Sequence, residues 1–144
     1  LFRSESAGGV FVQGGTIGNL SALVTARNTF REKRKDVSRW VIAASADAHS
    51  SIKSAADVMD VEILLIKPNQ EGSLQADAAA DAIDKYHSEN PTHQVFALVA
   101  TAGTTNLGII DDLQGLHAIR HCLVEVGLQA LLLTIDDSTL KALI

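Results

Sequence analysis

The sequence predicts a single α/β domain built on a mainly parallel β-sheet with helices on both faces. Short, continuously apolar runs alternate along the chain with longer segments in which apolar residues recur at helical spacing. Strands of a parallel sheet are covered on both faces and therefore read as unbroken apolar runs. The chain has 144 residues, of which 47% are hydrophobic, and this is enough for one packed core.

Each predicted element rests on its own local signal. The first helix ends in basic residues, which suit a helix C-terminus, and the second is rich in alanine. The turn at 69–72 precedes a third helix with Ala79 and Ile83 on one stripe, and Pro91 closes that segment. The predicted helices span 20–34, 50–59, 74–87 and 113–126, and the predicted strands span 40–44, 61–66, 95–100 and 130–135.

Composition and charge exclude several classes of function. The net charge is −5, and the basic run at 31–35 is short and interrupted by Glu32, so it indicates a solvated helix end and not a nucleic-acid-binding surface. No apolar stretch approaches the roughly 18 residues that a membrane span needs. The single Cys122 excludes an internal disulfide and agrees with a cytoplasmic protein. We predict no metal site. Because the chain begins at Leu1, we expect it to be a fragment of a longer protein.

Three loops are the candidates for a binding site. In open parallel sheets, ligands bind beyond the carboxyl ends of the strands. The loops at 13–19, 45–51 and 101–112 each follow a strand or open a helix, and they are rich in Gly, Thr, Ser or His. We therefore expect them to converge at one edge of the sheet.

The first loop contains Gly14, Gly15 and Thr16 and leads directly into a helix. Glycines let the backbone approach an anion closely, and the free N–H groups at a helix start point toward it, so a phosphate would fit here. The alternative is an ordinary Gly-rich turn in which Thr16 caps the helix. Neither the nucleotide P-loop nor the dinucleotide pattern is present.

The second and third loops offer a ring and several hydroxyl groups. His49 leaves a strand where its ring can lie against a flat ligand or transfer a proton, unless it only packs and Ser50 or Ser51 caps the helix. In the third loop Thr101 and its neighbours supply hydroxyl and backbone donors, and Asp111 or Asp112 is expected to cap the next helix. The alternative for this loop is a capped turn whose hydroxyls bond within it.

Taken together, the segments GGTIGNLSAL, ADAHSSIKSAA and ATAGTTNLGIIDDL resemble the group II pyridoxal-phosphate decarboxylases, which act on amino acids such as glutamate, aromatic amino acids and diaminobutyrate. The resemblance implies part of the large domain of the aminotransferase-like fold (fold type I), with pyridoxal 5'-phosphate as cofactor. It assigns Gly15 and Thr16 to the cofactor phosphate, His49 to stacking on the pyridine ring and positioning substrate, and Thr101 to the surroundings of the cofactor. It also implies an amino-acid substrate and a homodimer.

The resemblance covers about residues 9–128, so we predict a partial cofactor-binding domain over 1–128 and an atypical tail over 129–144. The family carries an aspartate that pairs with the pyridine nitrogen and, further on, a lysine that bonds covalently to the cofactor. Asp136 falls about three residues too late for that aspartate, and Lys141 lies too close to it to be that lysine. We therefore expect this chain to be inactive alone, although the complete parent would be a carboxy-lyase.

Two other functions remain open from the sequence. Another fold type I enzyme, either a carbon–carbon lyase or a desulfurase, would use the same phosphate and ring contacts. A degenerate, non-catalytic domain is the second alternative.

Overall fold

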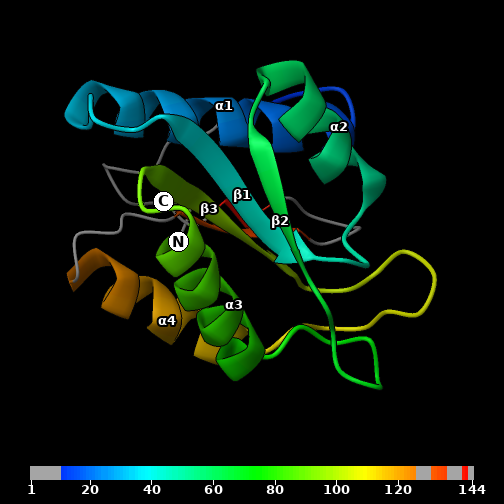
Figure 1. Cartoon of the computed structure of the whole chain (residues 1–144). Coiled ribbons are helices and arrows are strands. Elements are labelled where there is room, and N and C mark those ends of the chain that lie inside the picture. Colours follow the sequence, from blue (N-terminus) through cyan, green and yellow to red (C-terminus); the bar gives the residue numbers. More distant parts are fainter. Residues whose placement is uncertain (1–10, 126–130, 136–140, 143–144) are drawn as a thin grey trace, which may run out of the picture.

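The computed structural model describes residues 11–125, 131–135 and 141–142, and it contains one five-stranded sheet in the order β2-β1-β3-β4-β5 (Figure 1). Strands β2, β1, β3 and β4 are parallel, and β5 is antiparallel to β4. The strands are β1 (Arg39–Ser45), β2 (Glu62–Ile66), β3 (His93–Thr101), β4 (Leu131–Ile135) and β5 (Lys141–Ala142). The predicted mainly parallel sheet is confirmed.

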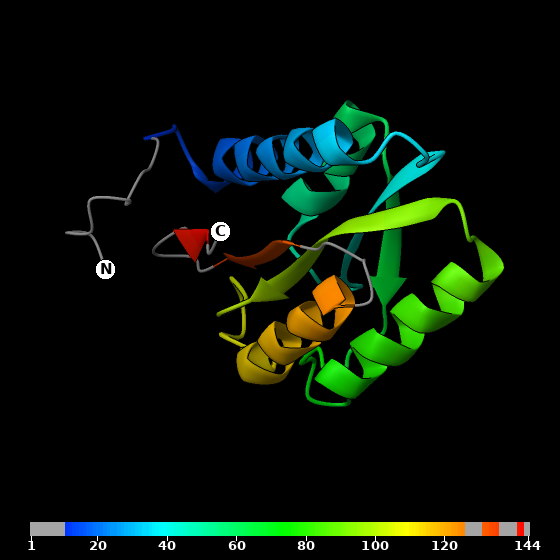
Figure 2. The ribbon, with the colours of Figure 1, turned by 90° about the vertical axis from the view of Figure 1, so that its left-hand side faces the viewer.

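Helices cover both faces of this sheet (Figures 1 and 2). The helices α1 (Gly15–Lys33) and α2 (Ser50–Met59) pack side by side on one face. The helices α3 (Ala76–Glu89) and α4 (Leu113–Glu125) lie together on the other face. Each parallel connection needs a crossover, and helices on both faces bury both sides of the strands.

Each face of the sheet has its own hydrophobic core. On the α1/α2 face the largest fully buried side chains are Phe96, Leu23, Ile42 and Ile52. On the α3/α4 face the corresponding side chains are Leu74, Ile83, Leu98 and Leu116. Burying one such side chain stabilises the fold by roughly 1.5–3 kcal/mol, so the two clusters hold the helices on the sheet.

A β-bulge interrupts the pairing of β1 with β3. Val41 pairs with Val95, but Ile42 pairs with Ala97, so Phe96 is an extra residue in β3. As a result Phe96 and Ala97 both belong to the α1/α2 cluster, whereas strict alternation would place them on opposite faces. Trp40 packs edge-on against Phe96, with ring centroids 6.1 Å apart.

The predicted elements are all present, but the helix predicted over 74–87 is observed at Ala76–Glu89, and the strand predicted over 95–100 at His93–Thr101. Helix α1 begins at Gly15 and not at Leu20, because Gly18 and Asn19 are buried and packing outweighs the low helix propensity of glycine. The predicted last strand is confirmed as β4, and β5 was not predicted. Asp136 lies outside the described residues, whereas the backbone of Lys141 pairs with Thr134 in the antiparallel strand β5.

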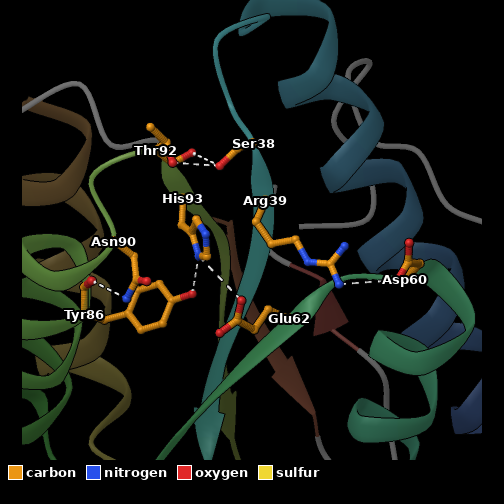
Figure 3. A network of polar contacts seen from close by, with 8 residues as sticks. All are labelled: Ser38, Arg39, Asp60, Glu62, Tyr86, Asn90, Thr92 and His93. Carbon is orange, nitrogen blue, oxygen red and sulfur yellow. Dashed lines mark hydrogen bonds and ion pairs between the residues drawn. The ribbon is translucent and has the colours of Figure 1, made fainter.

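Polar side chains gather at the amino ends of β1, β2 and β3, a group that we call the amino-edge cluster: Arg39, Glu62, Tyr86 and His93 (Figure 3). The Tyr86 hydroxyl lies 2.6 Å from Nδ1 of His93, and a Glu62 carboxylate oxygen lies 3.5 Å from the same nitrogen. Arg39 reaches the carboxylate of Asp60 at 3.5 Å. This cluster ties α3 to two strands at the edge opposite the candidate loops.

No helix in the described part of the chain is both long enough and apolar enough to cross a membrane. The basic run does form the predicted helix end, because α1 stops at Lys33 and Arg34 pairs with Asp36 at 3.0 Å. The side chains of Arg31, Lys33 and Lys35 are exposed.

Candidate functional site

The three candidate loops lie at the same edge of the sheet. Helix α1 runs antiparallel to β1, which follows it, so the start of α1 lies at the carboxyl edge of the strands (Figure 1). His49 stands in the connection that leaves the carboxyl end of β1, and Thr101 ends the neighbouring strand β3. The expected convergence at one edge is therefore what the topology produces.

The start of α1 presents free backbone donors. Gly14 adopts φ 80° and ψ 157°, a conformation that favours glycine, and it makes no side-chain cap. The first turn carries no acidic residue, and a Cβ built on Gly14 or Gly15 would meet nothing within 4 Å in the described structure. Thr16 is exposed and does not cap the helix, so the capping role that the alternative gave to Thr16 is wrong. An anion could approach these N–H groups directly.

His49 is itself the N-cap of α2. The alternative in which Ser50 or Ser51 caps this helix is therefore wrong. Its Nδ1 accepts a hydrogen bond from the backbone N–H of Ser51 at 3.2 Å, and the Ser51 hydroxyl lies 2.8 Å from the same nitrogen. The His49 side chain is exposed, so the rest of the ring faces outward from this cap.

Asn19 connects the first turn of α1 to this histidine. Its Nδ2 donates to the Ser51 hydroxyl oxygen at 2.7 Å, which makes a continuous path from Asn19 through Ser51 to His49. Asn19 and Ser51 are 2% and 3% exposed, so these bonds are shielded from water. The Oδ1 atom of Asn19 is buried without a protein partner among the described residues.

The backbone of Thr101 is held by Asp111. The Thr101 N–H donates to Oδ2 of Asp111 at 2.7 Å, and Oδ1 of Asp111 accepts from the N–H of Leu74 at 2.8 Å. Asp111 is 5% exposed, and burial raises the pKa of its carboxyl while the two backbone donors oppose the rise. Thr101 follows Val99 by two positions and therefore faces the same side as the α1/α2 core.

The next carboxylate has the capping role. Oδ1 of Asp112 accepts from the N–H of Gly115 at 3.0 Å, directly before α4 begins at Leu113. Of the two aspartates proposed as the cap, Asp112 is the one. Within the same loop, the Thr104 hydroxyl oxygen accepts from the N–H of Ile109 at 3.0 Å, so this threonine braces its own loop.

Comparison with known proteins then identifies the family. A model of the pyridoxal-dependent decarboxylase conserved domain matches residues 1–136. The chain belongs to the pyridoxal-dependent decarboxylase family. It is 32% identical over 116 residues to a probable L-tyrosine/L-aspartate decarboxylase of Methanospirillum hungatei, covering 81% of this chain and 28% of that relative. It is also 32% identical over 126 residues to a glutamate decarboxylase-like protein of Gibberella zeae, covering 83% and 24%.

Solved structures of the family confirm the predicted fold. The glutamate decarboxylase domain from a Vibrio parahaemolyticus protein superposes with a TM-score of 0.73 at 27% identity, over 90% of this chain and 30% of that one. Mouse CSAD has a TM-score of 0.74 at 24% identity, over 88% and 27%, and this likeness concerns the fold alone. The chain thus spans less than a third of the length of these relatives. The family match runs to residue 136, past the domain boundary predicted at residue 128. That boundary stays a prediction.

The residues present fit a phosphorylated aromatic cofactor. The space above Gly14 and Gly15, which a Cβ would fill, leaves room for a phosphate against the free N–H groups of α1. The exposed His49 ring is linked through Ser51 to Asn19, which lies about one turn after Gly15 on the same helix.

The sequence predicted neither the hydrogen bond between Asn19 and Ser51 nor the role of Asp111 in holding the Thr101 backbone. A polar amide in the apolar pattern of a helix, at Asn19, was the one available signal.

Proposed function

We propose that this chain supplies the phosphate- and ring-binding part of a pyridoxal 5'-phosphate site in an enzyme that decarboxylates an amino acid. The observation that carries the proposal is the start of α1, which no described side chain caps, linked through the buried side chains of Asn19 and Ser51 to the exposed ring of His49. In this proposal the start of α1 is the anion subsite and the His49 ring is the aromatic surface that lines the cofactor. Membership of the decarboxylase family supports the choice of cofactor.

Each residue has one proposed task. The N–H groups of Gly15 and Thr16, with the Thr16 hydroxyl, bind the phosphate at the positive end of the α1 dipole. The His49 ring stacks on the pyridine ring and directs its free edge toward the substrate. Thr101, held by Asp111, borders the cofactor at the end of β3. When bound, pyridoxal phosphate supplies an electron-accepting ring that takes up the electron pair left by departing carbon dioxide.

The substrate and assembly are part of the same proposal. Relatives carry the names of tyrosine, aspartate, glutamate and aromatic-amino-acid decarboxylases, so an α-amino acid is the proposed substrate class. We propose a homodimer in the cytoplasm as the working form. The single Cys122 agrees with a reducing compartment.

The covalent lysine of the site is proposed to lie outside this chain. Lys141 stands in β5, whose backbone is antiparallel to β4, and only four residues lie between it and Asp136 in sequence. Borohydride reduction of the purified chain with pyridoxal phosphate, followed by peptide mapping, should give no specific label at Lys141. A stoichiometric label there, with carbon dioxide release, would contradict this part of the proposal.

The binding test is a titration with pyridoxal phosphate, followed by equilibrium dialysis and absorbance. Thr16→Ala and Gly15→Val should each weaken binding at least several-fold, because the first removes a donor and the second fills the open approach. Thr29→Ala is the matched control, since Thr29 lies on α1 far from its start and its hydroxyl donates to the Thr25 carbonyl at 2.9 Å. Equal loss in the control, or equal affinity for pyridoxal without phosphate, would count against a phosphate site. Carbon dioxide release over a panel of amino acids tests the activity of the complete protein.

A further inference from the structure

The polarity of the path from Asn19 to His49 follows from a single backbone group. The Ser51 N–H can only donate, so Nδ1 of His49, which accepts it at 3.2 Å, carries no proton. The Ser51 hydroxyl and the same nitrogen lie 2.8 Å apart, and one of them must donate. The hydroxyl is therefore the donor, and the proton of the neutral ring is on Nε2.

The same reasoning extends one residue further. A hydroxyl that gives its proton to His49 must accept from Asn19, and at 2.7 Å the Asn19 side chain therefore presents its N–H₂ group and not its carbonyl. Asn19 is buried at 2% exposure, so water does not compete for this bond. The Asn19 amide and the Ser51 backbone N–H thus favour the same arrangement, in which both donors of Ser51 point at Nδ1 of His49.

We propose that Asn19 and Ser51 are positioning residues that hold His49 as the Nε2–H tautomer, with Nε2–H directed outward as a hydrogen-bond donor. A ring held at Nδ1 by two donors from the start of α2 has a fixed orientation as well as a fixed tautomer. The exposed edge then offers a donor to an acceptor oxygen, such as a carboxylate, of a molecule beside the ring. The role of this Nε2–H donor in substrate binding rests on the proposed function.

The decisive variant is Asn19→Asp, which keeps the shape of the side chain and reverses its role. A carboxylate only accepts, so the Ser51 hydroxyl would turn its proton toward residue 19 and offer a lone pair to His49. Nδ1 would then keep only the backbone N–H of Ser51 as a donor, and the population should shift from the Nε2–H tautomer toward Nδ1–H, which can donate to the Ser51 hydroxyl oxygen. Asn28→Asp is the control, because Asn28 is exposed on the same helix.

The measurement is the ¹⁵N chemical shift of both ring nitrogens in protein labelled at its five histidines, with His49 assigned through His49→Gln. In the unsubstituted protein Nδ1 should resonate in the unprotonated range and Nε2 in the protonated range. Asn19→Asp should move Nδ1 toward the protonated range, and Asn28→Asp should leave both shifts unchanged. Circular dichroism and thermal unfolding show which variants are folded.

A double variant distinguishes two causes of such a shift. One is transmission from Asn19 through the Ser51 hydroxyl to His49, which we call the relay, and the other is the added negative charge alone. In a Ser51→Ala background, Asn19→Asp should no longer alter the His49 shifts, because the connecting hydroxyl is gone. A shift that persists there would overturn the relay. If Asn19→Asp does not fold, Ser51→Thr and Ser51→Ala provide the comparison: the hydroxyl of Thr should preserve the Nδ1 shift, Ala should change it, and equal shifts in the two would overturn the proposal.

Titration with pyridoxal phosphate keeps the two proposals distinguishable. Binding in the unsubstituted protein, with His49 shifts insensitive to Asn19→Asp, would overturn the relay and leave the cofactor site standing. The expected tautomer pattern without cofactor binding would overturn the proposed function and leave the relay standing.

Discussion

The Oδ2 atom of Asp111 accepts a 2.7 Å hydrogen bond from the backbone N–H of Thr101, and the Asp111 N–H donates in return to the Thr101 carbonyl at 2.9 Å. With its second oxygen on the Leu74 N–H at 2.8 Å, this one side chain joins the end of β3 to the segment before α3. Both backbone groups are buried with it. The position of Thr101 therefore depends on a carboxylate that faces away from solvent.

Replacing Asp111 by Asn should destabilise the protein by about 1–3 kcal/mol, because an amide can accept only one of the two bonds and leaves a buried N–H unpaired. The free energy of unfolding in urea measures the loss. Asp112→Asn is the matched control, since Asn caps a helix about as well as Asp and should change the free energy of unfolding little. Similar losses in both variants would contradict a special role for Asp111.

The protein should lose stability as the pH falls below about 6.5, in part through His87. Burial lowers the pKa of His87, against the opposing effect of Asp84, and its Nε2 is buried without a protein partner in the described structure. The unfolded chain then binds the proton more readily than the folded one, so the free energy of unfolding rises with pH through the window below 6.5. His87→Leu should flatten this part of the profile. An unchanged slope in His87→Leu would contradict the assignment.

At alkaline pH the protein should lose stability through Tyr86 of the amino-edge cluster. Burial, followed by the neighbouring Glu62, raises the pKa of Tyr86, so the folded state keeps its phenol proton longer than the unfolded chain does. The contribution of Tyr86 is thus complete below about pH 10 and is lost as the pH rises above that value. Tyr86→Phe should remove this loss, at a cost near neutral pH of about 0.5–1.5 kcal/mol for the bond to His93. Unfolding followed from pH 8 to 11 would show whether the two curves converge; parallel curves would count against Tyr86.

Gly115→Ala should be destabilising although alanine favours helices. A Cβ at this position would lie 2.6 Å from the Cβ of Ala76 and would also collide with the Asp112 carboxylate, so α4 would have to move away from α3. Overpacking of this kind costs roughly 1–3 kcal/mol. Gln114→Ala, at an exposed position of the same helix, is the control and should be neutral or slightly stabilising. Adding Ala76→Gly to Gly115→Ala should recover part of the loss, and no recovery would point to a different contact.

The strands, the later helices and the edge at which the loops meet could be predicted because each depends on a local pattern of apolar residues. Other features depend on tertiary structure. Two adjacent aspartates look alike in sequence, and only the fold decides that Asp111 is buried while Asp112 caps α4. In the same way, two glycines at the start of α1 indicated a loop, but the burial of Gly18 brings that segment into the helix.

The extra residue in β3 determines which face of the sheet each later side chain of the strand lies on. Because neighbouring residues of a strand face opposite sides, one inserted residue inverts the assignment of all later positions. Without the bulge at Phe96, Thr101 would face α3 and α4, on the far side of the sheet from His49. The number of residues between the bulge and Thr101 therefore decides which side of the sheet this threonine faces, and deleting one residue from that stretch would turn Thr101 away from His49.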